Sequence, residues 1–184
     1  LLDYHRKIIV KRVEFNGRIG QFDLYTNQGT LEVYIPCTDK NLYILKADDF
    51  TPLDTIETES PLFAVAVHSS GNIFCSGSKF TVYDRNGALL SSLLAEGDCG
   101  LGFTDDYHLI AISTHLSPAT MSYYTGDGNG AFYDKKDDPY DYDYEKDGSR
   151  LKVSPNYVVT SSYGSIYAAD QNMTFLKKLS PSYN

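Results

Sequence analysis

The sequence predicts an all-β protein made of repeated four-stranded antiparallel units. The stretch 61–94 contains four short apolar runs separated by turn residues, and the same pattern returns elsewhere in the chain. Residues that favour strands are frequent, with 16 Tyr and 9 Phe among the 184 residues. Apolar runs with the period of an amphipathic helix are hard to find.

The unit at 61–94 shows the pattern most clearly. Its apolar runs are Val65–Val67, Ile73–Ser78, Phe80–Asp84 and Ala88–Leu90, and polar turns at 68–71 and 85–87 interrupt them. A four-stranded unit of this kind cannot bury its own faces, so it must stack on its neighbours.

Four such units follow one another within a single domain, residues 1–184. Their segments are 20–57, 61–94, 98–146 and 150–180, and the third carries an insertion at 115–131 and an acidic tract at 133–147. The third strands are expected to begin at Leu42, Phe80, Phe132 and Ile166, which are 38, 52 and 34 residues apart. Two of these intervals are near the spacing of a propeller blade, about 40 residues. The sequence therefore predicts a β-propeller of about four blades.

Short motifs at the strand ends resemble the WD-repeat family of β-propellers. Small residues end the predicted second strands at 76–78 and 160–162, and Ser154-Pro155-Asn156 is similar to a turn common in that family. Three pairs stand where the family has Trp-Asp: Tyr83-Asp84, Tyr133-Asp134 and Ala169-Asp170. The chain departs from the family because it has no Trp and no Gly-His pair. Related propellers of the quinoprotein-like or YVTN-like type fit these residues equally well.

The number of units raises the question of how the ring closes. Propellers have about four to eight blades, so the chain is either a small ring or part of a larger one. The segment 6–15 is predicted as one further strand, the outer strand of a preceding blade. An open half-ring would leave apolar faces bare, so additional blades or another subunit are expected to close it.

Charge and hydropathy limit the partners. The formal net charge is −8, the opposite of the basic balance of nucleic-acid binders. No stretch approaches the roughly 18 apolar residues of a membrane-spanning helix. We therefore expect protein partners with basic patches, and neither nucleic acid nor a membrane. The basic clusters at 5–7, 11–12 and 177–178 are interpreted as solvated strand edges.

The acidic tract contains the candidate binding site. Tyrosines and acids alternate at Tyr140, Asp141, Tyr142, Asp143 and Tyr144, so an extended backbone places rings and acids on opposite sides. Tyrosine offers contact area at low entropic cost, and the acids select a basic partner. The alternative interpretation is a solvated loop between blades.

A second candidate is the turn at 125–130. Asp127 and Asn129, with Asp134 downstream, faintly resemble the start of a calcium-binding loop, but the spacing of the later ligands fails. A flexible turn is the expectation here, and no cofactor or metal is predicted. The alternative function is a secreted or surface propeller that binds calcium or glycan.

No catalytic motif is found. The carboxylate pairs Asp48-Asp49 and Asp105-Asp106 fall in predicted hairpin turns, where Asp makes local hydrogen bonds. His68 and His108 are expected to be polar turn residues. The predicted function is a non-enzymatic scaffold that binds protein through its loops; part of a propeller enzyme with its active site elsewhere is a further alternative.

The number and spacing of the cysteines indicate the cellular compartment of the protein. The three cysteines, Cys37, Cys75 and Cys99, form no CxxC pair, and the first two fall in apolar strands. We interpret these two as small buried hydrophobic residues. Sparse, unpaired cysteines favour a reducing compartment, so a cytoplasmic location is expected, with an extracellular one as the alternative.

Overall fold

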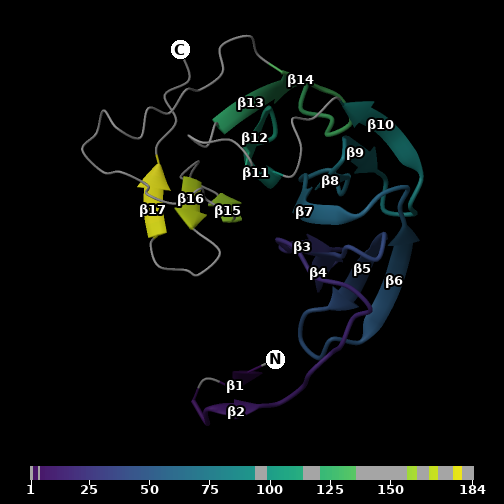
Figure 1. Ribbon diagram of the computed structural model, residues 1–184, viewed down its shortest axis with the longest axis vertical. Coiled ribbons are helices and arrows are strands. Elements are labelled where there is room, and N and C mark those ends of the chain that lie inside the picture. The colour runs from purple at the N-terminus through teal and green to yellow at the C-terminus, as the bar shows by residue number, and fades with distance from the viewer. Residues whose placement is uncertain are drawn as a thin grey trace.

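The computed structural model describes residues 2–3, 5–93, 99–113 and 121–135, and the strands at 157–160, 166–169 and 176–179. Within these residues every regular element is a β-strand, and the strands form small antiparallel sheets (Figure 1). No helix in the described part of the chain is long and apolar enough to cross a membrane.

The first sheet is a four-stranded meander. Its strands are β3 (Asp23–Asn27), β4 (Thr30–Pro36), β5 (Asn41–Lys46) and β6 (Pro52–Glu57), in that spatial order. The β3–β4 hairpin closes through Gln28 and Gly29, whose φ angles are 47° and 84°. Two successive positive φ values define the tight turn that matches the twist of paired strands, and glycine adopts such a value at little cost.

The second and third sheets repeat this meander. The second contains β7 (Leu62–Val67), β8 (Ile73–Gly77), β9 (Phe80–Tyr83) and β10 (Leu89–Leu93). The third contains β11 (Cys99–Asp105), β12 (His108–Ser113), β13 (Met121–Gly126) and β14 (Tyr133–Lys135).

The third sheet corrects one strand assignment. Residues 121–126 form its third strand, so the predicted insertion at 115–131 contains a regular strand. Tyr133 lies in the fourth strand, where it pairs with Gly126. The pair Tyr133-Asp134 is therefore not at the end of a third strand. The sequence did not predict this strand because Tyr123 and Tyr124 lie between Ser122 and Thr125, so residues 121–126 do not form an apolar run.

The two ends of the chain also differ from expectation. In place of one strand over 6–15, β1 (Leu2–Asp3) and β2 (Ile8–Ile9) form a short hairpin, followed by an irregular segment. The last sheet contains β15 (Tyr157–Thr160), β16 (Ile166–Ala169) and β17 (Leu176–Leu179). Residues 157–160 were expected as a second strand, but β15 lies beside β11, the position of an inner strand.

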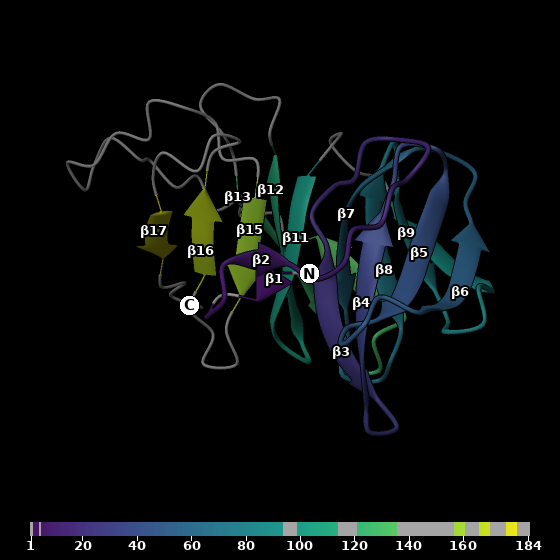
Figure 2. The ribbon, with the colours of Figure 1, turned by 90° about the horizontal axis from the view of Figure 1, so that it is seen from below.

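The sheets are arranged around a common axis. β3 and β7 are neighbours, β7 and β11 are neighbours, and β11 lies beside β15, so the first strand of each sheet faces the centre of an arc. Figure 1 shows this arc, and Figure 2 shows the strands of successive sheets standing side by side. The prediction of an all-β propeller of four-stranded antiparallel blades is confirmed.

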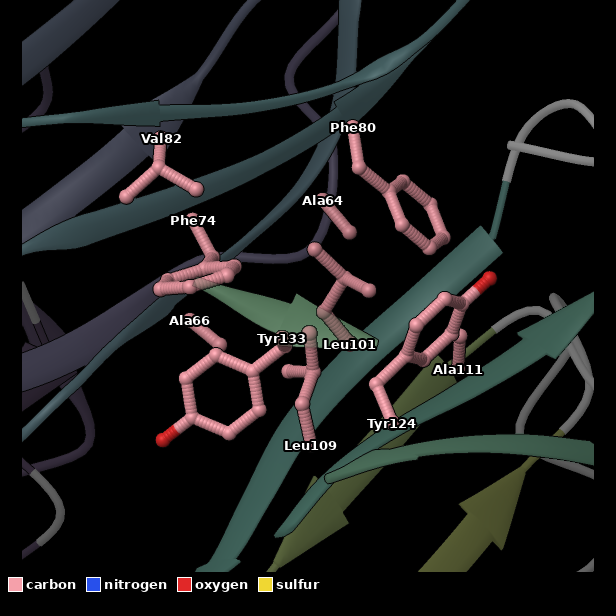
Figure 3. Close-up of a cluster of buried hydrophobic side chains, with 10 residues drawn as sticks. All are labelled: Ala64, Ala66, Phe74, Phe80, Val82, Leu101, Leu109, Ala111, Tyr124 and Tyr133. Carbon is pink, nitrogen blue, oxygen red and sulfur yellow. The ribbon is translucent and has the colours of Figure 1, made fainter. Parts of the chain in front are cut away.

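Apolar side chains fill the spaces between blades. Phe74, Phe80 and Val82 of the second sheet meet Leu101, Leu109 and Tyr124 of the third (Figure 3). A second cluster joins the first sheet to the second through Tyr34, Leu42, Ile44, Val65 and Ile73. Each of these two blade interfaces is thus a core of its own, and burial of this apolar area is the main stabilising contribution.

Cys37 and Cys75 are both completely buried, as expected for small hydrophobic residues, and Cys75 belongs to the core between the first and second sheets. Burial raises the pKa of both thiols. In a Cys99→Ala variant we expect both remaining thiols to react with Ellman's reagent at least ~100-fold more slowly in the native protein than in denaturant, because a thiol must be exposed and ionised to react. Rapid labelling of either thiol in the folded protein would contradict this burial.

Candidate functional site at the blade joints

Two networks of polar residues connect a turn of one blade to the neighbouring blade. The first, called here the His68 joint, contains His68, Ser70, Asp106, Gly130 and Tyr133. His68 follows β7 and is only 1% exposed. Its Nδ1 accepts from the Ser70 backbone N–H at 3.1 Å, so Nε2 carries the ring hydrogen and donates to the Asp106 carbonyl at 3.1 Å. His68 therefore connects the second blade to the first turn of the third.

Aromatic rings complete the His68 joint. The ring of His68 lies 5.1 Å from that of Phe103 and 6.2 Å from that of Tyr133, both in edge-on contact. The Tyr133 hydroxyl donates to the same Asp106 carbonyl. Burial raises the pKa of Tyr133, so the hydroxyl stays protonated and remains a donor. One backbone carbonyl thus ties two side chains from different blades to one point.

The β13–β14 turn covers this joint. Gly130 has a φ of 69°, and a Cβ built on it would lie 2.2 Å from His68 Nδ1 and 2.6 Å from Ser70 Oγ. Only glycine allows so close an approach of the backbone to these side chains. The Asn72 side-chain amide also donates to the Asn129 carbonyl at 3.4 Å.

Asp127 stabilises the same turn. Its Oδ1 accepts from the Asn129 backbone N–H at 2.9 Å, and its Oδ2 accepts from the Asn129 side-chain amide at 2.8 Å. The backbone N–H lowers the pKa of the Asp127 carboxyl. Asp134 lies on β14, outside this turn. In the portion of the chain with described coordinates, no three His, Cys, Asp or Glu side chains gather as metal ligands.

The second network, the Arg85 joint, connects the first and second blades. Arg85 in the β9–β10 turn donates from Nε and Nη2 to both carboxylate oxygens of Glu32 at 3.2 and 3.3 Å, and from Nη1 to Asp54 at 3.0 Å. Tyr34 Oη donates to Glu32 Oε2 at 2.6 Å. Burial alone would raise the pKa of Glu32, but the Tyr34 hydroxyl and the Arg85 guanidinium together lower it.

Two further polar side chains join the blades near the axis. Gln21 Nε2 donates to the Leu101 carbonyl at 2.6 Å and so connects the first blade to the third. Asp23 on β3 accepts from the Val67 backbone N–H at 2.8 Å. Burial raises the pKa of Asp23, although its bonds to backbone N–H groups oppose the shift. The sequence does not distinguish Gln21 and Asp23 from ordinary polar residues in strands, because their partners are backbone groups far away in the chain.

The carboxylates and histidines predicted to lie in turns make the following contacts. Asp49 accepts from the Thr51 N–H and Asp105 from the Tyr107 N–H, which confirms local hydrogen bonding in hairpin turns. His108 lies beside Asp105, with Nδ1 2.8 Å from Oδ1. The interpretation of His68 as a polar turn residue missed its burial and its contacts with the third blade.

The predicted binding residues Tyr140, Asp141, Tyr142, Asp143 and Tyr144 lie outside the described residues. Their anchors are described: the connection leaves the outer strand β14 at Lys135 and enters the inner strand β15 at Tyr157. Because β14 runs away from the β13–β14 turn, the connection starts at the rim opposite the His68 joint. The turns at 37–40, 58–61 and 78–79 lie at that same rim.

Comparison with solved structures agrees with this architecture. A chain of the mitotic checkpoint complex is 15% identical and aligns with a TM-score of 0.63 over 90% of this chain and 49% of its own. The RRP9 WD40 repeats align with a TM-score of 0.62 at 10% identity, over 90% of this chain and 49% of theirs. The computationally designed Ika4 protein aligns with a TM-score of 0.57 at 10% identity, over 92% of this chain and 94% of its own.

These likenesses concern the fold. The chain spans about half the length of the WD40-repeat chains it matches. No protein-family model and no curated protein matches it in sequence. The chain is therefore a β-propeller structure of four-stranded antiparallel blades, similar in fold to WD40-repeat propellers.

Proposed function

We propose that this protein is a non-enzymatic scaffold of the cytoplasm that binds protein partners through loops held by its blades. The observation that carries the proposal is the pair of polar joints between blades. The His68 and Arg85 joints fix neighbouring blades to one another through partly buried hydrogen bonds. Loops on such a rigid frame lose little entropy on binding, and binding residues are often found there.

The connection between β14 and β15 is the proposed contact. Alternating Tyr and Asp at 140–144 provide flat aromatic area together with negative charge. The net charge of −8 adds a long-range preference for basic partners, which speeds association at low salt. The anchors of this connection belong to adjacent blades, since β11 of the third sheet lies beside β15.

The test replaces the tract without touching the blades. A variant with Tyr140, Tyr142 and Tyr144 changed to Ala, and Asp141 and Asp143 changed to Asn, is expected to lose captured partners by at least ~10-fold, since aromatic anchors dominate such contacts. Quantitative mass spectrometry of affinity-captured protein from cell extract provides the measurement. The thermal unfolding midpoint should stay unchanged.

The matched control is Asp48→Asn with Glu57→Gln, which removes two exposed acids elsewhere. Equal loss in both variants would mean that general charge, not the tract, selects partners. Retention of all partners by the tract variant would refute the proposal. Deleting all of 126–148 is a poorer experiment, because it removes β14 and the buried Tyr133.

A further inference from the structure

We propose that a groove beside the first sheet binds a long-chain fatty acid, with the hydrocarbon chain inside the groove and the carboxylate at Lys11 and Arg12. The groove lies between the sheet and the segment that follows β2, and its volume is about 680 Å³. Sites for small ligands typically have volumes of about 300–1,000 Å³. The groove is therefore large enough to hold a long hydrocarbon chain.

The first sheet forms the floor of the groove. Along β4 and β5, Tyr34, Leu42 and Ile44 pack against the second blade. Val33 and Leu45 alternate with these residues and point to the opposite side of the sheet. Both line the groove and are almost completely buried. The floor is thus a closed apolar surface that belongs to a packed sheet.

The segment after β2 forms the opposite wall. The hairpin of β1 and β2 lies on this side of the sheet in Figure 1. Val13 and Phe15 are half-buried and alternate with exposed neighbours, so they point toward the sheet. The ring of Phe15 lies 4.9 Å from that of Tyr43. Because this segment already lies on the sheet, a flat partner sheet could not reach the floor without displacing it.

The walls fit a hydrocarbon chain better than a peptide. All the lining residues except Lys11 and Arg12 are apolar. A bound peptide would bring backbone N–H and C=O groups, and burying such groups without hydrogen bonds is costly. A hydrocarbon chain has no such groups, and the burial of its apolar surface favours binding. It would also cover Phe22 and Leu24, which are 56% and 52% exposed at the groove.

Lys11 and Arg12 provide the charge that selects an acid. Both line the groove and are exposed, so a head group beside them can stay in contact with water. No acidic residue is among the described residues that line the groove, although the whole chain has a net charge of −8. The pKa of Asp49 is lowered by the Thr51 backbone N–H and, to a smaller extent, by the Lys11 ammonium. We therefore expect Arg12, whose guanidinium can form two parallel hydrogen bonds to a carboxylate, to be the main partner.

Fluorescence titration of the full chain with a dansyl-labelled undecanoic acid tests the proposal. We expect saturable binding of one probe per chain, and displacement of the probe by dodecanoate. Dodecyltrimethylammonium has the same chain length but the opposite charge, so it should displace the probe at least ~10-fold less well. Lys11→Gln with Arg12→Gln should weaken dodecanoate binding by at least ~10-fold and remove this preference for the acid.

Leu24→Asp places a charge in the groove and should weaken the binding of dodecanoate and of the neutral dodecanol alike. Leu89→Asp is the matched control, because Leu89 is also 50% exposed but lies on β10, the outer strand of the second blade. It should leave binding unchanged, and circular dichroism should show that both variants are folded. The absence of saturable binding, equal displacement by the acid and the ammonium compound, or equal loss in the Leu24 and Leu89 variants would each overturn the proposal. Sedimentation with phosphatidylglycerol vesicles in place of binding of the free acid would overturn it as well.

Discussion

Replacing Gly130 by alanine is expected to destabilise the protein by about 2–5 kcal/mol. The new Cβ would lie 2.2 Å from His68 Nδ1, so the buried ring or the turn must move. Overpacking of this kind costs about 1–3 kcal/mol. The backbone adds a further cost, because a positive φ disfavours a residue with a Cβ by about 1–2 kcal/mol. Urea denaturation with a single, probe-independent transition measures the free energy of unfolding.

Gly29→Ala separates the two causes. Gly29 has a φ of 84°, yet nothing lies within 4 Å of the position of its Cβ. This variant should therefore show only the backbone cost, about 1–2 kcal/mol. In a His68→Ala background, Gly130→Ala should cost about 1–3 kcal/mol less, since the clashing ring is gone. Equal destabilisation by the two glycine variants would show that Gly130 does not pack on His68.

Arg85→Met is expected to destabilise the protein by about 2–3 kcal/mol at neutral pH. The change leaves Glu32 ionised, with its side chain 5% exposed and without its guanidinium partner. Loss of one partner of a fully buried pair costs about 3–5 kcal/mol. Because Arg85 is itself 26% exposed, water can replace part of the lost interaction and we expect a smaller value. Thermal and urea unfolding at pH 7 give the measurement.

The effect of Arg85→Met should depend on pH with a definite sign. The pKa of Glu32 is lowered in the folded protein from an ordinary value of 4.5. Its contribution to stability is therefore complete above that value and is lost as the pH falls through the folded pKa. The difference between wild type and variant should shrink below pH 4.5. A difference that grows on acidification would contradict the proposed pairing.

A double variant provides the control for this joint. Glu32→Gln removes the charge that Arg85→Met leaves behind, so the double variant should be more stable than Arg85→Met alone. The coupling between the two sites is expected to be about 1–3 kcal/mol, as for residues within one hydrogen-bonded network. Additive losses would mean that Glu32 and Arg85 act independently.

Strand patterns local to each unit were readable in the sequence. The runs around Val65, Phe74 and Phe80 predicted three strands of the second blade because apolar runs end at turn residues there. The third blade was harder. Its strand at 121–126 does not contain a run of apolar residues, and the sequence around Tyr133 was interpreted as the end of the third strand although it belongs to the fourth. In the third blade, residues 121–126 form a strand because they pair with the neighbouring strand β12, and not because of their own apolar pattern.

The polar contacts between blades could be identified only from the tertiary structure. Gln21 bonds to a carbonyl 80 residues away, and Arg85 reaches Glu32 across 53 residues. The identity of a polar side chain does not reveal its partner, since the acceptor of each of these hydrogen bonds is a backbone group or a side chain of another blade. Gly130 illustrates the point, because turns favour glycine anyway, and only the packed His68 ring explains why a Cβ cannot fit.

The sequence by itself determined the kind of unit: short apolar strands, separated by turns, in four successive sets that must stack. These features are local, and the alternation of side chains along a strand makes them visible. Only the tertiary structure decided which strand lies innermost and which polar side chains hold neighbouring blades together. These features arise from contacts between blades, and the order of residues along one strand does not encode its partners in space.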